Sequence, residues 1–348
     1  MSTGRKFADA GRFLISGSGT VYLVLIAIFA VIFVNNAGFF EAGNLLLFVK
    51  KAAPLLILAV GQYFVIVAGE FDLSVGSLVG AQVVLAALLI DGEEARTWPV
   101  ILLMLAIGAG VGLVNGLITT LLKVPSIITT LGMMLVLFGA IRLLTGGAPT
   151  GKLSDGFRVL GNKGIIIESV GVVPWALFIV IAVGVGAVFL MRSSFGRTLV
   201  AVGDNEKAAG FAGTRVWWVR TAAFVLSGLS ATVAGILVGG YAGLTSQVGD
   251  GMEFVAITAV VLGGVVLGGG RGAVLAAMAG ALTVESLFTL FTQLEVSSTL
   301  RPTAQGLIII AAVAYASRER SRRHTPHLST KPAEPNGHHP DRVLKESR

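Results

Sequence analysis

The chain has 348 residues and carries 26 Lys and Arg against 19 Asp and Glu, a net charge of +7. Only 13% of the residues are charged, about half the fraction usual in soluble domains, whereas 54% are hydrophobic and 46 are glycine. This composition excludes a single soluble globule, which needs a polar exterior, and also the disordered, collagenous and disulfide-stapled classes. The lack of cysteine excludes thiolate catalysis and Cys-ligated metals.

Apolar runs of membrane length recur along the chain, since a hydrocarbon core about 30 Å thick needs roughly 20 apolar residues per helix. We expect an all-α fold, a polytopic membrane helix bundle with about ten transmembrane helices. The count falls to eight if the runs cut by glycine or charge do not span. The ten candidates are residues 20–38, 52–69, 73–90, 98–121, 126–145, 172–191, 221–241, 254–270, 272–292 and 300–316.

Lys and Arg are distributed unequally between the two sets of loops that these spans create. With the N-terminus inside, 18 of the 26 lie in inner segments and seven lie in outer loops. Because positive residues gather on the cytoplasmic side of membrane proteins, both termini are predicted to be cytoplasmic. The charge of +7 is then an orientation signal, and no nucleic-acid partner is expected.

Three regions follow from these patterns. Residues 1–19 form a cytoplasmic N-terminal segment with no signal-peptide cleavage site, residues 20–317 form the transmembrane domain, and residues 318–348 form a basic tail that we expect to be disordered. All four histidines lie in the tail. A solvated tail is favoured there over a metal site, and no metal site or catalytic residue is expected in the membrane body, which has neither His nor Cys.

A near-match to the phosphate-binding P-loop, GGAPTGKL, occupies residues 146–153. Leu153 stands where a Ser or Thr should hold magnesium, and the stretch follows a membrane span on the predicted outer side. We therefore expect this chain to bind no ATP and no other cofactor.

Two carboxylates interrupt the apolar pattern in GEFDLSVGS, residues 69–77. A charge between membrane helices is costly unless it is satisfied. Asp72 is well placed to cap the following helix by accepting from the amides near Ser74 and Val75. Direct contact with a passing substrate is the second possibility, and the two roles can coexist, because broken helices often line transport pathways.

The same segment resembles GGIDLSVGS, a signature of the inner-membrane permease subunits of ribose-type ABC sugar importers. Four further segments resemble other motifs of that family in the same order, over about residues 20–316, and DLSVGS is the sugar-type form rather than that of the more distant branched-chain amino-acid permeases. They are GQYFVIVAG (61–69), SIITTLGMMLVLFGA (126–140), SFGRTLVAVGDNEKAAGFAG (194–213) and VAITAVVLGGVVLGGGRG (255–272). The chain departs from the family patterns at Glu70, Phe71, Thr214 and Val266.

The resemblance implies a multi-pass permease of the bacterial inner membrane that imports a monosaccharide or related polyol, and not an enzyme. It also implies three partners: ATP-binding cassette subunits that carry ATP and magnesium, a periplasmic or lipid-anchored sugar-binding protein, and a second permease copy in a homodimer or heterodimer. An ion-coupled secondary transporter, with Glu70, Asp72 or Glu285 carrying the ion, is the alternative. A channel is a third possibility, although it would not need a structured cytoplasmic loop.

The longest predicted inner loop, residues 192–220, contains a short helix. Gly203 is expected to break the chain, Asp204 or Asn205 to cap the helix and Glu206 to start it. Ala208, Ala209 and Phe211 follow, and Gly213 is expected to end it. Two helical turns are unstable alone in water, so the helix must dock, and the resemblance implies that it is the helix that couples the permease to the ATPase. A helix lying on the bilayer is the alternative.

Polar side chains within the predicted spans are few. The candidates for the substrate pathway are Gln62, Asp72, Ser74, Ser77, Asn115 and Glu285. Each neutral residue among them could equally hydrogen-bond a neighbouring helix. Most glycines are expected to allow close helix packing, and the cluster at 263–272 is also expected to bend the chain.

Overall fold

The computed structural model describes residues 17–146, 148, 150–169, 171–245, 247–300, 303, 306, 307 and 310. Nearly all of the predicted N-terminal segment, most of the last candidate span and the whole basic tail with its four histidines lie outside the described residues.

The described chain is a helix bundle with one small hairpin. Its helices are α2 (Gly17–Asn35), α3 (Ala42–Val67), α4 (Val75–Ile90), α5 (Thr97–Leu121), α6 (Ser126–Thr145), α7 (Asp155–Asn162), α8 (Trp175–Arg192), α9 (Ser194–Asp204), α10 (Glu206–Phe211), α11 (Val216–Ala242), α12 (Met252–Leu262) and α13 (Val274–Gln293). Short 3-10 helices occupy Ala37–Phe40, Glu94–Arg96 and Ser298–Leu300. Strands β1 (Gly164–Ile167) and β2 (Gly171–Pro174) pair antiparallel, with Ile165 opposite Val173.

The predicted helical membrane bundle is confirmed as a class. Among the described residues, α3, α5 with the turn before it, α6, α8, α11 and α13 are long and apolar enough to cross a membrane by length and composition. Three shorter apolar helices, α2, α4 and α12, coincide with further candidate spans. Large apolar side chains also point outward, as on α6, where Leu143 is 85% exposed. Such a surface suits lipid or another protein and does not suit water.

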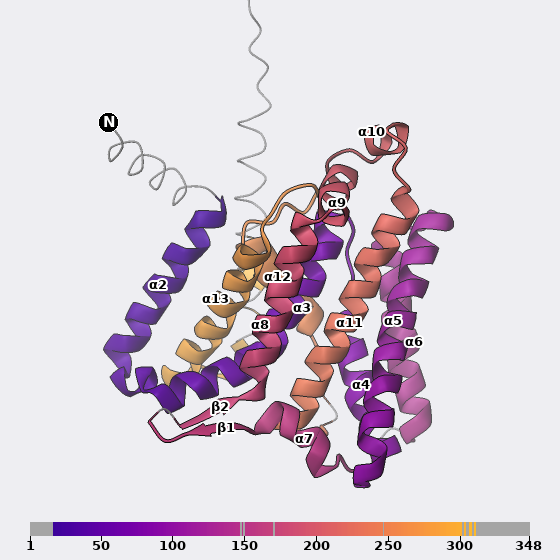
Figure 1. Cartoon of the computed structure of the whole chain (residues 1–348). Coiled ribbons are helices and arrows are strands. Elements are labelled where there is room, and N and C mark those ends of the chain that lie inside the picture. The colour runs from indigo at the N-terminus through magenta and orange to yellow at the C-terminus, as the bar shows by residue number, and fades with distance from the viewer. Residues whose placement is uncertain are drawn as a thin grey trace, which may run out of the picture.

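Helix α11 lies at the centre of the bundle and packs against α3, α4 and α5 (Figure 1). Its contact with α5 is close because small residues face one another. A Cβ at Gly108, Gly112 or Gly116 of α5 would meet the backbone or a hydroxyl of α11 within 3 Å. The expected packing role of this glycine row is confirmed. In a membrane, where lipid removes the hydrophobic drive between helices, such close contact supplies the packing energy.

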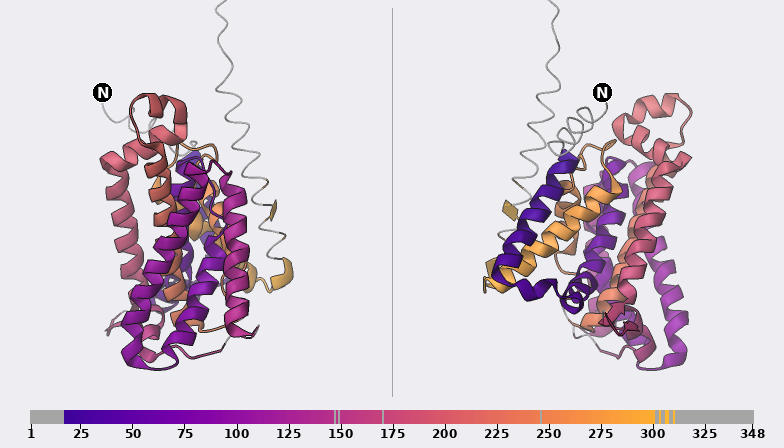
Figure 2. Two further views of the ribbon diagram at one scale, coloured as in Figure 1. Left: turned by 90° about the vertical axis from the view of Figure 1, so that its right-hand side faces the viewer. Right: turned by 60° about the vertical axis from the view of Figure 1, so that its left-hand side comes forward.

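The two ends of the bundle are different. Figure 1 shows α9 and α10 at one end and α7 with the hairpin at the other, and Figure 2 shows the same separation from two further sides. The predicted inner loop at 192–220 and the predicted outer loop at 146–171 therefore lie at opposite ends. Opposite ends are expected for these two loops, because a single predicted span, residues 172–191, separates them.

The candidate span at 254–270 is wrong beyond Leu262. Helix α12 has 11 residues, about 16 Å at the usual rise, and the chain then leaves the helix for turns up to Ala273. The physical reason is the glycine cluster that was expected to bend the chain: Gly264, Gly269 and Gly270 have positive φ angles, which an α-helix does not contain. Before α12, the backbone at Gly249 lies against Gly76 and Gly80 of α4.

Candidate functional site

Asp72 lies in the break between α3 and α4 and is 1% exposed. Its Oδ1 accepts hydrogen bonds from the Ser74 amide at 3.0 Å and from the Ser74 hydroxyl at 2.6 Å. The expected bond to the Ser74 amide is therefore present, but Asp72 is not the N-cap of α4. That position is held by Ser74, whose side chain makes no capping hydrogen bond, and Asp72 lies two residues before it. The other carboxylate oxygen, Oδ2, accepts from the Ser227 hydroxyl of α11 at 2.8 Å. Asp72 thus holds the start of α4 against the central helix.

Asn115 of α5 extends this cluster, because its side-chain amide donates to the Ser74 hydroxyl at 2.9 Å. Asp72, Ser74, Asn115 and Ser227 are each at most 1% exposed, and we call them the Asp72 cluster. Asp72, Ser74 and Asn115 are predicted pathway residues, and with Ser227 the cluster draws on three segments: the break after α3, α5 and α11. Ser227 is not among the predicted pathway residues, although it is a polar residue inside the predicted span 221–241. Its position beside Gly228, which packs closely against α5, is the signal that could have selected it.

The other predicted pathway residues lie elsewhere. Gln62 of α3 is fully buried, and neither of its amide atoms has a hydrogen-bond partner within the described part of the chain. Glu285 is half-buried on α13. Hydrogen bonds among the described residues thus connect three of the six predicted pathway residues, Asp72, Ser74 and Asn115.

Ser77 lines a cavity of about 250 Å³ between α4, α6 and the segment before α12. Each of these three elements contributes both polar and apolar side chains to the lining of the cavity. The lining residues are Ser77, Gly80, Val84, Phe138, Ile141, Arg142, Thr145, Thr245, Val248 and Asp250. Arg142 is not among the predicted pathway residues, although it is a basic residue inside the predicted span 126–145. An ionisable side chain within a membrane helix is a functional candidate by default, and that signal could have found it.

The short helix of the inner loop is α10. The Asn205 side chain accepts from the Ala208 amide at 3.0 Å, so Asn205, one of the two expected capping residues, is the N-cap. Glu206 is the first helical residue, and Gly213 follows the helix with φ of +84°. Ala209 is buried, whereas Phe211 is 92% exposed. A large apolar side chain on the outer face of a helix at the end of the bundle is suited to a protein partner.

The expected chain break at Gly203 is wrong, because Gly203 lies within α9 and the break falls at Asn205. The physical reason for a glycine here is close contact. A Cβ on Gly203 would overlap the Val67 carbonyl oxygen at the end of α3 and would lie 2.5 Å from the Gly270 amide. The same carbonyl accepts a hydrogen bond from the Gly270 amide at 2.9 Å. The ends of α3 and α9 and the glycine loop after α12 therefore meet at one point.

Comparison with known proteins agrees with this architecture. The model of a family described as branched-chain amino acid transport system / permease component matches residues 44–314. The chain is 29% identical to the autoinducer 2 import system permease protein LsrC of Yersinia enterocolitica over 317 residues, 90% of this chain and 87% of the relative. It is 29% identical to LsrC of Yersinia pseudotuberculosis over 304 residues, 87% of this chain and 85% of the relative. No solved structure matches the chain significantly.

Proposed function

Because the chain belongs to the branched-chain amino acid transport system / permease component family, we propose that it forms half of the membrane pathway of an ATP-driven importer of a monosaccharide or related polyol. It is a permease subunit of the inner membrane, with several long apolar helices, and not an enzyme. ATP and magnesium are bound by separate cassette subunits, the solute is delivered by an extracytoplasmic binding protein, and a second permease copy completes the pathway. The end bearing α9 and α10 faces the cytoplasm, because Lys and Arg are concentrated in the loops predicted to lie on that side.

The observation that carries the proposal is α10. It is a capped helix that extends beyond the bundle, exposes Phe211 almost completely and is followed directly by the central helix α11. An apolar side chain on such a helix fits the helix-in-groove mode of recognition. Docking of an ATPase subunit on α10 would connect ATP hydrolysis to the helix that contacts α3, α4 and α5.

Substituting Phe211→Ala is expected to separate ATP hydrolysis from uptake. In proteoliposomes that hold the permease with its ATPase subunit and binding protein, uptake should fall by about tenfold, the usual effect of losing an interface anchor. The solute is the best-transported member of a labelled panel of ribose, xylose, arabinose and galactose. Phe189→Ala is the matched control, since Phe189 is also exposed, at 68%, but lies on α8. Equal uptake by Phe211→Ala and wild type would contradict docking through α10, and uptake driven by a proton gradient without ATP would overturn the proposed function.

The cavity beside Ser77 is the proposed solute-contacting part of the pathway. Its volume, about 250 Å³, is below the range of roughly 300–1,000 Å³ common for drug-sized ligands, so it suits a single small solute. Arg142 and Asp250 offer a donor and an acceptor of opposite charge, and the hydroxyls of Ser77, Thr145 and Thr245 add weak hydrogen bonds. Donors and acceptors side by side suit a neutral hydroxylated solute, because each of its hydroxyls can both donate and accept a hydrogen bond.

Substituting Arg142→Gln is expected to raise the half-saturating solute concentration by about tenfold, because a hydrogen bond from a charged group contributes about 1.5–3 kcal/mol. The maximal rate should change less. Arg158→Gln is the control, since Arg158 is an exposed residue of α7 and does not line the cavity. Unchanged concentration dependence in Arg142→Gln would remove this cavity from the pathway. The measurement is initial uptake rate against solute concentration.

A further inference from the structure

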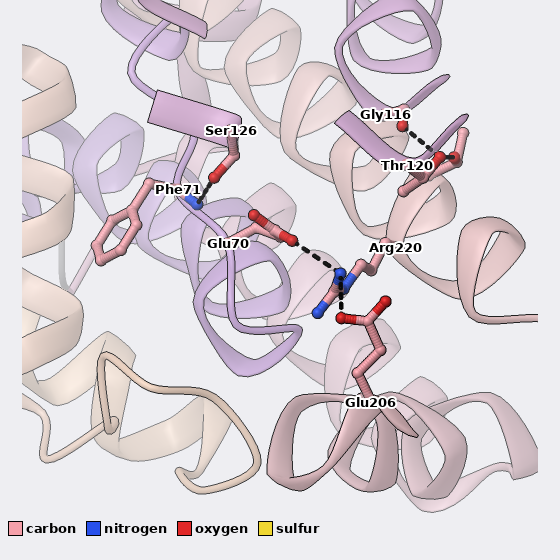
Figure 3. Close-up of polar contacts among 8 residues, drawn as sticks. Glu70, Phe71, Gly116, Thr120, Ser126, Glu206 and Arg220 are labelled. Atoms are coloured by element: carbon pink, nitrogen blue, oxygen red, sulfur yellow. Dashed lines mark hydrogen bonds and ion pairs between the residues drawn. The ribbon is translucent and has the colours of Figure 1, made fainter. Parts of the chain in front are cut away.

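Arg220, in the second turn of α11, lies between two carboxylates that come from distant parts of the chain. Its Nη1 is 3.1 Å from Glu70 Oε1 and 3.1 Å from Glu206 Oε2. Glu70 belongs to the break between α3 and α4, and Glu206 is the first residue of α10. Figure 3 shows the Arg220 side chain reaching both carboxylates, so one guanidinium connects three elements.

The Arg220 connection is stronger than an ordinary surface pair. The side chains of Arg220 and Glu70 are only 16% and 13% exposed, and Glu206 is 55% exposed. Partial exclusion of water strengthens the attraction between the charges and reduces its screening by salt. By contrast, Arg271 and Asp204 are 4.0 Å apart and both more than 60% exposed, and pairs of that kind contribute little.

The segment that Arg220 holds is also tied to the interior. The Phe71 amide donates to the Ser126 hydroxyl at the start of α6 at 3.1 Å, as Figure 3 also shows. Asp72, one residue further along, belongs to the buried Asp72 cluster. A displacement of Glu70 therefore acts on a segment whose neighbouring residues position α4, α6 and α11. Glu70 itself is one of the positions at which the chain departs from the sugar-permease signature.

We propose that Arg220 is a positioning residue that transmits displacement of α10 to the break between α3 and α4 through its paired contacts with Glu206 and Glu70. This inference rests on the proposed function, in which an ATPase subunit docks on α10. When α10 moves, Glu206 moves with it, and Arg220 carries the motion to Glu70. Without Arg220, the carboxylates of Glu70 and Glu206 would face each other and repel. Removing Arg220 would therefore break the whole connection between α10 and the break after α3.

The test uses the complete transporter in proteoliposomes and measures ATP hydrolysis and solute uptake separately, with the panel sugar that wild type transports best. Arg220→Gln is expected to keep its ATP hydrolysis while uptake per ATP falls by about fivefold or more, the lower end of common coupling between sites. Arg220→Lys keeps the charge and should restore part of the loss. Arg96→Gln is the matched control, since Arg96 pairs with Glu93 at 2.9 Å, with both side chains more than half exposed, in the turn before α5.

A double-mutant cycle distinguishes two roles for Arg220: transmitting the movement of α10 to Glu70, and merely stabilising the position of α11. If Arg220 acts through Glu206, the double variant Arg220→Gln with Glu206→Gln should lose no more uptake per ATP than Arg220→Gln alone, and the same holds for Glu70→Gln. Losses that multiply, or a parallel fall of hydrolysis and uptake in Arg220→Gln, would overturn the inference while leaving the proposed function intact. Failure of the wild-type transporter to show any ATP-dependent uptake would overturn the proposed function and this inference with it.

Discussion

Substituting Gly203→Val is expected to abolish most transport and to lower the stability of the chain. The new side chain would overlap the Val67 carbonyl oxygen and would approach the Gly270 amide, which are hydrogen-bonded to each other. Overpacking of this kind costs about 1–3 kcal/mol, and backbone atoms cannot move aside as a flexible side chain does. The ends of α3 and α9 would have to separate. Gly203→Ala should show the same effect to a smaller degree.

Thermal unfolding of the purified permease in lipid nanodiscs and ATP-dependent uptake by the full transporter are the two measurements. Gly186→Val is the matched control, because a Cβ at Gly186, within α8, would meet nothing within 4 Å. It carries the same intrinsic helix cost of exchanging glycine for a β-branched residue without the contact. If both variants unfold at the same temperature as wild type, the meeting of α3, α9 and the glycine loop is not a tight contact.

The second large effect is expected at Asp72. Asp72→Ala removes the acceptor for the Ser74 amide, the Ser74 hydroxyl and the Ser227 hydroxyl. Each buried polar group left unsatisfied costs about 1–3 kcal/mol, and Asp72 is only 1% exposed. We therefore expect Asp72→Ala to lower the unfolding temperature strongly and to prevent assembly with the ATPase subunit. Asp72→Asn keeps one oxygen acceptor and should be milder, and Ser227→Ala milder still.

The order of these three variants in nanodisc thermal unfolding tests whether Asp72 is structural. Asp155→Ala is the control, since Asp155 is exposed at the start of α7. If Asp72→Ala unfolds at the wild-type temperature but has lost uptake, then Asp72 contacts the solute and does not stabilise the helix packing. Both roles were expected from the sequence, and this series distinguishes between them.

Several local features of the candidate site follow directly from sequence. The Asn205 cap, Glu206 at the first helical position and Gly213 after the helix all correspond to expected signals, because capping depends only on residues a few positions apart. The prediction for Asp72 was similarly local: the bond to the Ser74 amide is present, although Ser74 and not Asp72 is the N-cap of α4. The error at Gly203 arose because a glycine that serves a contact with a distant carbonyl looks, in sequence, like a glycine that ends a helix.

The sequence by itself determined the class of the protein, the position of most of its helices and its expected orientation. It could do so because a membrane span must satisfy its own backbone hydrogen bonds and be predominantly apolar over about 20 residues. Only the tertiary structure decided which polar residues meet. Ser227 and Asp72 are 155 positions apart, and Arg220 bridges two glutamates that belong to different helix ends. Such partners are chosen by helix packing, and no short-range pattern in the chain records them.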